Sequence, residues 1–161
     1  MNNINLLKNI VIMRSKIKQI HNHMMKYQKK KNSIKRCLDN SQILYDYCKY
    51  KGIKNVKAQA YICSGEKEDG TPFSLAHLAI MIDSERIDPS YEINSLPNIK
   101  YYKSYREFMD SKYSEGFNED ILKLYLKFVK YSDSMNSDKF VVSNQKYYTN
   151  QFDYLRGLCL N

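Results

Sequence analysis

The sequence predicts an α+β fold in which helices pack on a small antiparallel sheet. Three observations lead to this prediction: a helical pattern over 33–51, two strand-like segments at 55–63 and 74–82, and further helical patterns after residue 104. A chain of 161 residues is long enough for one domain with a buried core and short for two. We therefore expect a single domain over residues 1–161.

The chain begins with a basic helical segment, residues 1–30, and residues 26–33 are polar, lysine-rich and typical of a connector. Apolar side chains recur in this segment at close to helical spacing, with lysines between them: Leu7, Ile10 or Val11, Ile17, Ile20 and Met24. Such a stripe usually packs against a core. A basic start without acidic residues also fits a targeting segment or an amphipathic membrane anchor.

Residues 33–91 form the central part of the predicted domain. The second helix is expected to follow a capping residue at Asn32 or Ser33. It should run to about Lys51 and end at Gly52, a residue type favoured just past the end of a helix.

Strands are expected after this helix. Apolar and polar residues alternate over 55–63, which predicts a half-buried strand. Residues 74–82 are apolar on both faces and fit a central strand. A turn at Asp83 and Ser84 leads to a third strand at 85–88.

The length of this turn decides whether His77 and Asp88 can meet. With a two-residue turn, Ile82 pairs with Glu85, and His77 and Asp88 become diagonal neighbours on the same face of the sheet. A three-residue turn would place them on opposite faces.

The remaining residues, 92–161, form a mostly helical C-terminal portion. Helices are expected at 105–109, 118–131 and 147–158, and a short strand at 140–142.

The net charge of +9 is unevenly distributed, because residues 1–60 carry +12 and the remaining residues carry −3. A basic N-terminal half is typical of proteins that contact nucleic acid or an anionic membrane surface. Abundant Lys, Asn, Ile and Tyr also fit a compositional bias with solvated lysines, and we favour this interpretation over a nucleic-acid partner.

The four cysteines form no CxxC motif and no pairing pattern, which favours a reduced, intracellular and cytoplasmic protein. No apolar run reaches the roughly 18 residues needed to span a bilayer, so we expect no transmembrane segment. His21 and His23 point to different helix faces, and no phosphate-binding or cofactor motif is present. We therefore expect neither a metal nor a cofactor.

Three residues suggest a chemistry because of where they lie. Cys37 stands near the start of the second helix, where unpaired backbone N–H groups and the helix dipole stabilise a thiolate and can bind an oxyanion. His77 lies within an apolar strand, and Asp88 follows the hairpin. Each has an ordinary structural alternative, the Asp-Pro turn among them. Together they suggest a nucleophile, its base and the residue that orients the base.

The sequence around these three residues resembles the transglutaminase-like branch of the papain-like cysteine enzymes. The similar features are a Cys at a helix start, a Gly-Ile exit from that helix, a strand, a His on the next strand, and an Asp-Pro after a tight hairpin. They lie at 37–44, 51–56, 76–82 and 86–89. The resemblance implies a papain-like core, in which Cys37 attacks an acyl group, His77 acts as general base and acid, and Asp88 fixes the imidazole tautomer.

The chain departs from that family's pattern at three points. Leu78 follows the His where Trp is frequent, Arg36 precedes the Cys where a small residue is common, and no Trp is present to act as an oxyanion donor. Gln28 and Tyr27 are the alternative donors.

The expected function is a thiol-dependent hydrolase or acyl-transferase, most simply a cysteine peptidase that cleaves an amide or isopeptide bond of a protein or peptide substrate. The alternative is a non-catalytic domain of the same fold that binds protein or nucleic acid through its basic N-terminal half.

Overall fold

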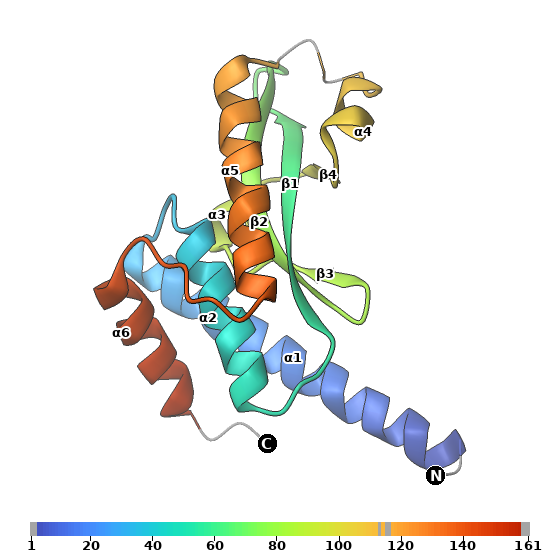
Figure 1. The fold of residues 1–161 in the computed structure, drawn as a ribbon, viewed down its shortest axis with the longest axis vertical. Helices are drawn as coiled ribbons and strands as arrows, with labels where there is room; N and C mark the ends of the chain where they lie inside the picture. The colour runs from blue at the N-terminus through green and yellow to red at the C-terminus, as the bar shows by residue number, and fades with distance from the viewer. Residues whose placement is uncertain (1–2, 113, 115–116, 159–161) are drawn as a thin grey trace.

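The computed structural model describes residues 3–112, 114 and 117–158 (Figure 1). It is an α+β fold, as predicted. The elements in chain order are α1 Asn3–Lys31, α2 Cys37–Tyr50, β1 Val56–Glu66, β2 Pro72–Ile82, β3 Glu85–Ile87, α3 Tyr91–Asn94, β4 Lys100–Tyr102, α4 Tyr105–Met109, α5 Glu119–Asn136 and α6 Gln145–Arg156.

The sheet has the strand order β3-β2-β1-β4, and all neighbouring strands are antiparallel. Strands β1 and β2 pair over their full length, from Val56 opposite Ile82 to Glu66 opposite Pro72. Helices α2 and α5 cover one face of these two strands (Figure 1). The strand predicted at 74–82 is therefore central, as its apolar character on both faces indicated.

Helix α2 lies in the core between the sheet and α6. Its apolar side chains Ile43, Leu44, Tyr47 and Cys48 are fully buried. The Tyr47 hydroxyl donates to the carbonyl of Leu155 on α6 at 3.0 Å. Packing on both sides fixes the position of α2, and with it the position of Cys37 at its first turn.

Helix α2 ends as predicted. Gly52 has a φ of +74°, and its N–H donates to the Lys49 carbonyl while the N–H of Ile53 donates to the Cys48 carbonyl. These two bonds form a Schellman motif, which needs a left-handed residue at this position.

The expected connector at 26–33 and the expected cap of α2 are wrong. Helix α1 continues to Lys31, because lysine and glutamine are good helix formers and Gln28 is buried inside the protein. Asn32 takes a left-handed conformation that ends α1, while Arg36 precedes α2 without a side-chain capping bond. No helix among the described residues is both long and apolar enough to cross a membrane.

The turn between β2 and β3 contains two residues, as the site hypothesis required. Asp83 and Ser84 both have positive φ, typical of a type I′ turn, and Ile82 pairs with Glu85. The predicted hairpin register is therefore confirmed.

The second face of β1 differs from the prediction of a half-buried strand, because Tyr61 and Cys63 on that face are also buried. Strand β4, which the sequence pattern did not predict, pairs beside β1 and places Tyr101 opposite Cys63. The Tyr101 ring packs edge-on against Tyr61 and covers this face.

The expected strand at 140–142 is wrong, since this segment is irregular and binds side chains of α2. The N–H of Val141 donates to Gln42, and the N–H of Ser143 donates to the buried carboxylate of Asp39. These bonds replace the strand ladder that the apolar run suggested.

The three C-terminal helices occur near their predicted positions. Helix α4 has the predicted bounds, α5 extends five residues beyond 131, and α6 begins two residues before 147. Asn118 and Asn144 cap α5 and α6 through their side chains.

We expect Gly52→Ala to lower the free energy of unfolding by about 1 kcal/mol, because a Cβ is strained at positive φ. A Cβ at Gly52 would touch nothing within 4 Å, so the cost comes from the backbone alone. Urea denaturation measures it. The control is Gly157→Ala, at the end of α6 with a φ of −73°, which should not destabilise the protein. Equal effects of the two substitutions would contradict this explanation.

Candidate active site

Cys37 is the first residue of α2 and is half-buried. Arg36 provides no side-chain cap, so its side chain does not occupy the first-turn N–H groups of the helix. Such groups favour a neighbouring anion. The helix start thus provides the setting that the sequence indicated for a reactive thiol.

The other two described cysteines have unreactive settings. Cys48 and Cys63 are fully buried. Burial raises the pKa of Cys48 to about 12, and burial together with the nearby Asp88 charge raises the pKa of Cys63 well above its usual range. Cys159 lies outside the described residues.

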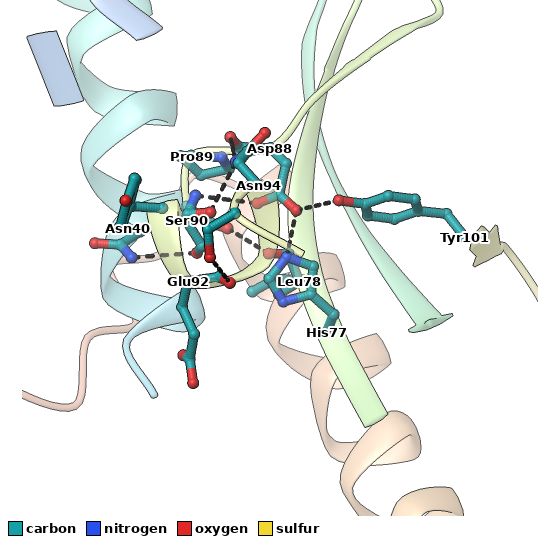
Figure 2. A network of polar contacts seen from close by, with 12 residues as sticks. Asn40, His77, Leu78, Asp88, Pro89, Ser90, Glu92, Asn94 and Tyr101 are labelled. Atoms are coloured by element: carbon teal, nitrogen blue, oxygen red, sulfur yellow. Dashed lines mark hydrogen bonds and ion pairs between the residues drawn. The ribbon is translucent and has the colours of Figure 1, made fainter. Parts of the chain in front are cut away.

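His77 and Asp88 are in direct contact. The Nε2 atom of His77 lies 2.7 Å from Oδ2 of Asp88, and the two side chains are 2% and 4% exposed (Figure 2). The bond is possible because the hairpin register places both residues on one face of the sheet. This is the contact that the two-residue turn predicted.

The third residue lies near the imidazole, because the Cys37 side chain is close enough to His77 to help raise the pKa of its ring. Nε2 of His77 is directed at a carboxylate, an acceptor, so it carries a hydrogen. The Nδ1 atom is then left for Cys37. The structure therefore brings all three predicted site residues together.

This contact changes the acidity of the imidazole. Burial disfavours a charged ring, but the Asp88 charge, the hydrogen bond with Asp88 and the nearby Cys37 side chain together outweigh burial. They raise the pKa of His77 to about 10. The folded protein therefore favours an imidazolium next to the thiol.

Asp88 is held by two further donors. The Tyr101 hydroxyl donates to Oδ2 at 2.6 Å, and the N–H of Ser90 donates to Oδ1 at 3.0 Å (Figure 2). With His77, they satisfy both carboxylate oxygens. The Asp-Pro turn that served as the structural alternative is thus also the segment that orients the carboxylate.

Tyr101 is a site residue that the sequence did not reveal. It comes from the three-residue strand β4, and the guanidinium of Arg86 lies 3.6 Å from its ring centre. Burial and the neighbouring Asp88 raise the pKa of Tyr101, so the hydroxyl remains a donor. The tyrosine-rich stretch around it carried no signal that separated Tyr101 from its neighbours.

Buried amides fix the segment that follows Asp88. Gln28 of α1 donates to the Pro89 carbonyl at 2.6 Å and accepts from the N–H of Tyr91 at 2.8 Å. Asn40 of α2 donates to the Ser90 hydroxyl at 3.1 Å (Figure 2). Two helices therefore hold this segment relative to Cys37.

A further bond ties α2 to the strand that carries His77. The Ser41 hydroxyl, one turn after Cys37, donates to the carbonyl of Leu78 at 3.0 Å. Position 78, where the resembled family often has Trp, thus contributes a backbone carbonyl to the placement of the helix.

The alternative oxyanion donors differ in their setting. The amide of Gln28 is occupied by Pro89 and Gln151, so it is not available to a substrate. The ring of Tyr27 packs on Tyr154, with 5.0 Å between ring centres.

An open cleft of about 880 Å³ lies beside Asp88 and Tyr101. Arg14, Lys18 and His21 of α1 form one wall, and the His21 ring contacts the Asp88 carbonyl at 3.0 Å. Among the described residues, no group of three or more His, Cys, Asp or Glu side chains is arranged to hold a metal ion.

No known protein family, curated protein or solved structure matches this chain. The function is therefore inferred from the geometry of the site.

We expect the His77 ring to keep its proton at about pH 8, and Asp88→Asn to lower its pKa below 6.5, because burial then dominates. Carbon–proton NMR of the imidazoles measures this, with His77→Gln assigning the signal. The raised pKa also means that the free energy of unfolding falls as the pH rises from about 6.5 to about 10. A neutral His77 ring at about pH 8 in the unmodified protein would contradict the prediction.

We expect Tyr101→Phe to lower the free energy of unfolding by about 1–3 kcal/mol, because a buried carboxylate loses a donor while the ring is kept. Chemical denaturation measures the loss. Tyr154→Phe, at a residue 38% exposed, is the control and should change stability by about 0.5 kcal/mol or less. If both variants unfold at the same denaturant concentration, the Tyr101 hydroxyl does not stabilise Asp88.

Proposed function

We propose that this protein is a thiol-dependent hydrolase or acyl-transferase, most simply a cysteine peptidase that acts on an amide or isopeptide bond. The observation that carries the proposal is the hydrogen bond between His77 and Asp88, with Cys37 close enough to the imidazole to affect its acidity. These residues come from a helix start, a central strand and the segment after a hairpin. A nucleophile, a base and an orienting acid in this order are what acyl transfer requires.

In the proposed reaction His77 is the imidazolium and holds a proton on Nδ1, Cys37 reacts as the thiolate, and its sulfur attacks the carbonyl carbon of the substrate. A C–S bond forms, and the carbonyl electron pair moves to oxygen. When the tetrahedral intermediate collapses, the C–N bond breaks and His77 gives its proton to the leaving amine. The product is a thioester on Cys37.

The thioester is then released by a second attack. Water, or an amine in the transfer reaction, loses a proton to His77 and attacks the acyl carbon, and the thiolate leaves. Asp88 keeps Nε2 protonated throughout, so that Nδ1 is the atom that exchanges the proton.

The start of α2 is the proposed oxyanion site. Backbone N–H groups of Cys37 and the following residues point out of the first turn, and the side chain of Arg36 does not cap them. This removes the need for a tryptophan or glutamine donor, consistent with the absence of Trp from the chain and the occupied amide of Gln28.

We further propose that the helix α2, the strands β1 to β3 and the Asp-Pro segment form a papain-like core of transglutaminase type. The order of these elements and the helix packed on an antiparallel sheet support this relationship. Helices α1 and α6 then pack around that core, and β4 adds the edge strand that supplies Tyr101.

Iodoacetamide labelling near neutral pH tests the proposal. We expect Cys37 to react at least about 10-fold faster than Cys48 or Cys63, with mass spectrometry of peptides locating the label. His77→Gln and Asp88→Asn should each slow the labelling of Cys37. Labelling is done in a Cys159→Ser background, so that only the described cysteines compete.

Cys48→Ser is the matched control, because it removes a thiol from the same helix and should leave the rate at Cys37 unchanged. Equal rates at the three cysteines, or a His77→Gln variant that is folded and labels normally, would exclude the enzyme hypothesis. The fold would then serve as a non-catalytic binding domain.

Substrate turnover supplies a second test. A mixture of peptide acyl donors with hydroxylamine should yield hydroxamates, since hydroxylamine captures a thioester at Cys37. Cys37→Ser should abolish the product. The ratio of hydrolysis to hydroxamate formation distinguishes a peptidase from an acyl-transferase.

A further inference from the structure

The first part of α1 projects from the body of the protein (Figure 1). The buried side chains of α1 begin at Ile17, whereas large apolar residues before it are exposed. Ile4, Leu7 and Val11 are 64%, 61% and 66% exposed, values that are rare for apolar residues gathered on one helix. A surface of this kind indicates an interaction site.

The exposed apolar residues gather on one half of the helix. Ile4, Leu7 and Val11 follow at spacings of three and four and form one line along α1, and Leu6 and Ile10 form the neighbouring line. We call these five residues the projecting surface. The opposite half carries the polar residues Asn5, Lys8 and Asn9, together with Ile12.

The positive charge of α1 indicates what kind of partner the projecting surface binds. The helix carries eight Lys and Arg and no Asp or Glu, and the nearest cations to the projecting surface are Lys8 and Arg14. A second copy of α1 would bring more cations and no acidic partner, so pairing of two copies would cost electrostatic repulsion. An anionic surface complements this charge.

The exposed apolar side chains distinguish between the two possible anionic partners, a nucleic acid and a bilayer of anionic lipids. A nucleic acid binds through cations and hydrogen bonds to phosphate and would leave the projecting surface in water. A bilayer with anionic lipids binds both the apolar and the basic side chains. Leucine, isoleucine and valine enter the acyl boundary, while lysines lie at the headgroups.

We propose that the projecting surface binds an anionic lipid bilayer, with the first turns of α1 lying in the plane of the interface. The proposal does not depend on the enzyme hypothesis. Leu7 precedes His21, which contacts the Asp88 carbonyl, by 14 residues, which places Leu7 roughly 20 Å along α1 from that contact. The two properties can therefore be measured separately.

Vesicle co-sedimentation of the full chain tests this inference. We expect binding to phosphatidylcholine vesicles that contain about 30% phosphatidylserine, weaker binding to phosphatidylcholine alone, and loss of binding as salt is raised. Leu7→Glu should weaken binding at least about 10-fold, because it introduces a charge at the centre of the apolar half. Lys8→Gln should weaken it about fivefold.

Leu126→Glu is the matched control, since Leu126 is 51% exposed on α5, away from α1, and this variant should bind vesicles normally. Leu7→Glu should also leave the labelling rate of Cys37 unchanged, which shows that the variant is folded.

Three results would overturn the inference. The first is no binding to phosphatidylserine vesicles. The second is a concentration-dependent dimer in sedimentation, lost in Leu7→Glu, without vesicle binding, which would assign the projecting surface to a second copy. The third is RNA or DNA binding that Leu7→Glu does not affect and that displaces the vesicles.

Discussion

The candidate site depends on the burial of a short polar segment that leaves the sheet after β3. Asp88 and Ser90 are 5% and 3% exposed, and burying them without partners would cost several kcal/mol. His77 and Tyr101 bind the Asp88 carboxylate, Asn40 of α2 binds Ser90, and Gln28 of α1 binds the backbone of the neighbouring Pro89 and Tyr91. Because the same bonds tie two helices to this segment, the position of Cys37 relative to Asp88 follows from the need to satisfy buried polar groups.

The buried ion pair is itself a cost to the fold. A pair such as His77 and Asp88 gains little stability over apolar residues of similar volume, since both groups lose hydration. An apolar residue at position 77 would fit the apolar strand β2 without this hydration cost. The pair therefore argues for a chemical role, which fits the raised pKa of His77 and the nearby Cys37 side chain.

The predictable part of the site was the part governed by local rules. Alternation along the strands and a two-residue turn determine the register, and the register alone brings His77 to Asp88. The position of Cys37 followed from helix periodicity and from Gly52 at the other end of α2. Tyr101 and Gln28 could not be found this way, because a three-residue strand and a lysine-rich helix end carry no periodic signal for the distant residues that they contact.

Two of the errors in the prediction share one physical origin. Residues 26–31 are polar and were expected to form a connector, yet they stay helical because Gln28 finds partners 61 and 63 residues away in the sequence. Residues 140–142 are apolar and were expected to pair as a strand, yet their backbone binds side chains of α2. In both cases a buried side-chain amide satisfies distant backbone groups, so tertiary hydrogen bonds decide the local structure. Such bonds connect the elements that form the site, which explains why local sequence patterns predicted the helix start at Cys37 but not the hydrogen-bond network that positions it.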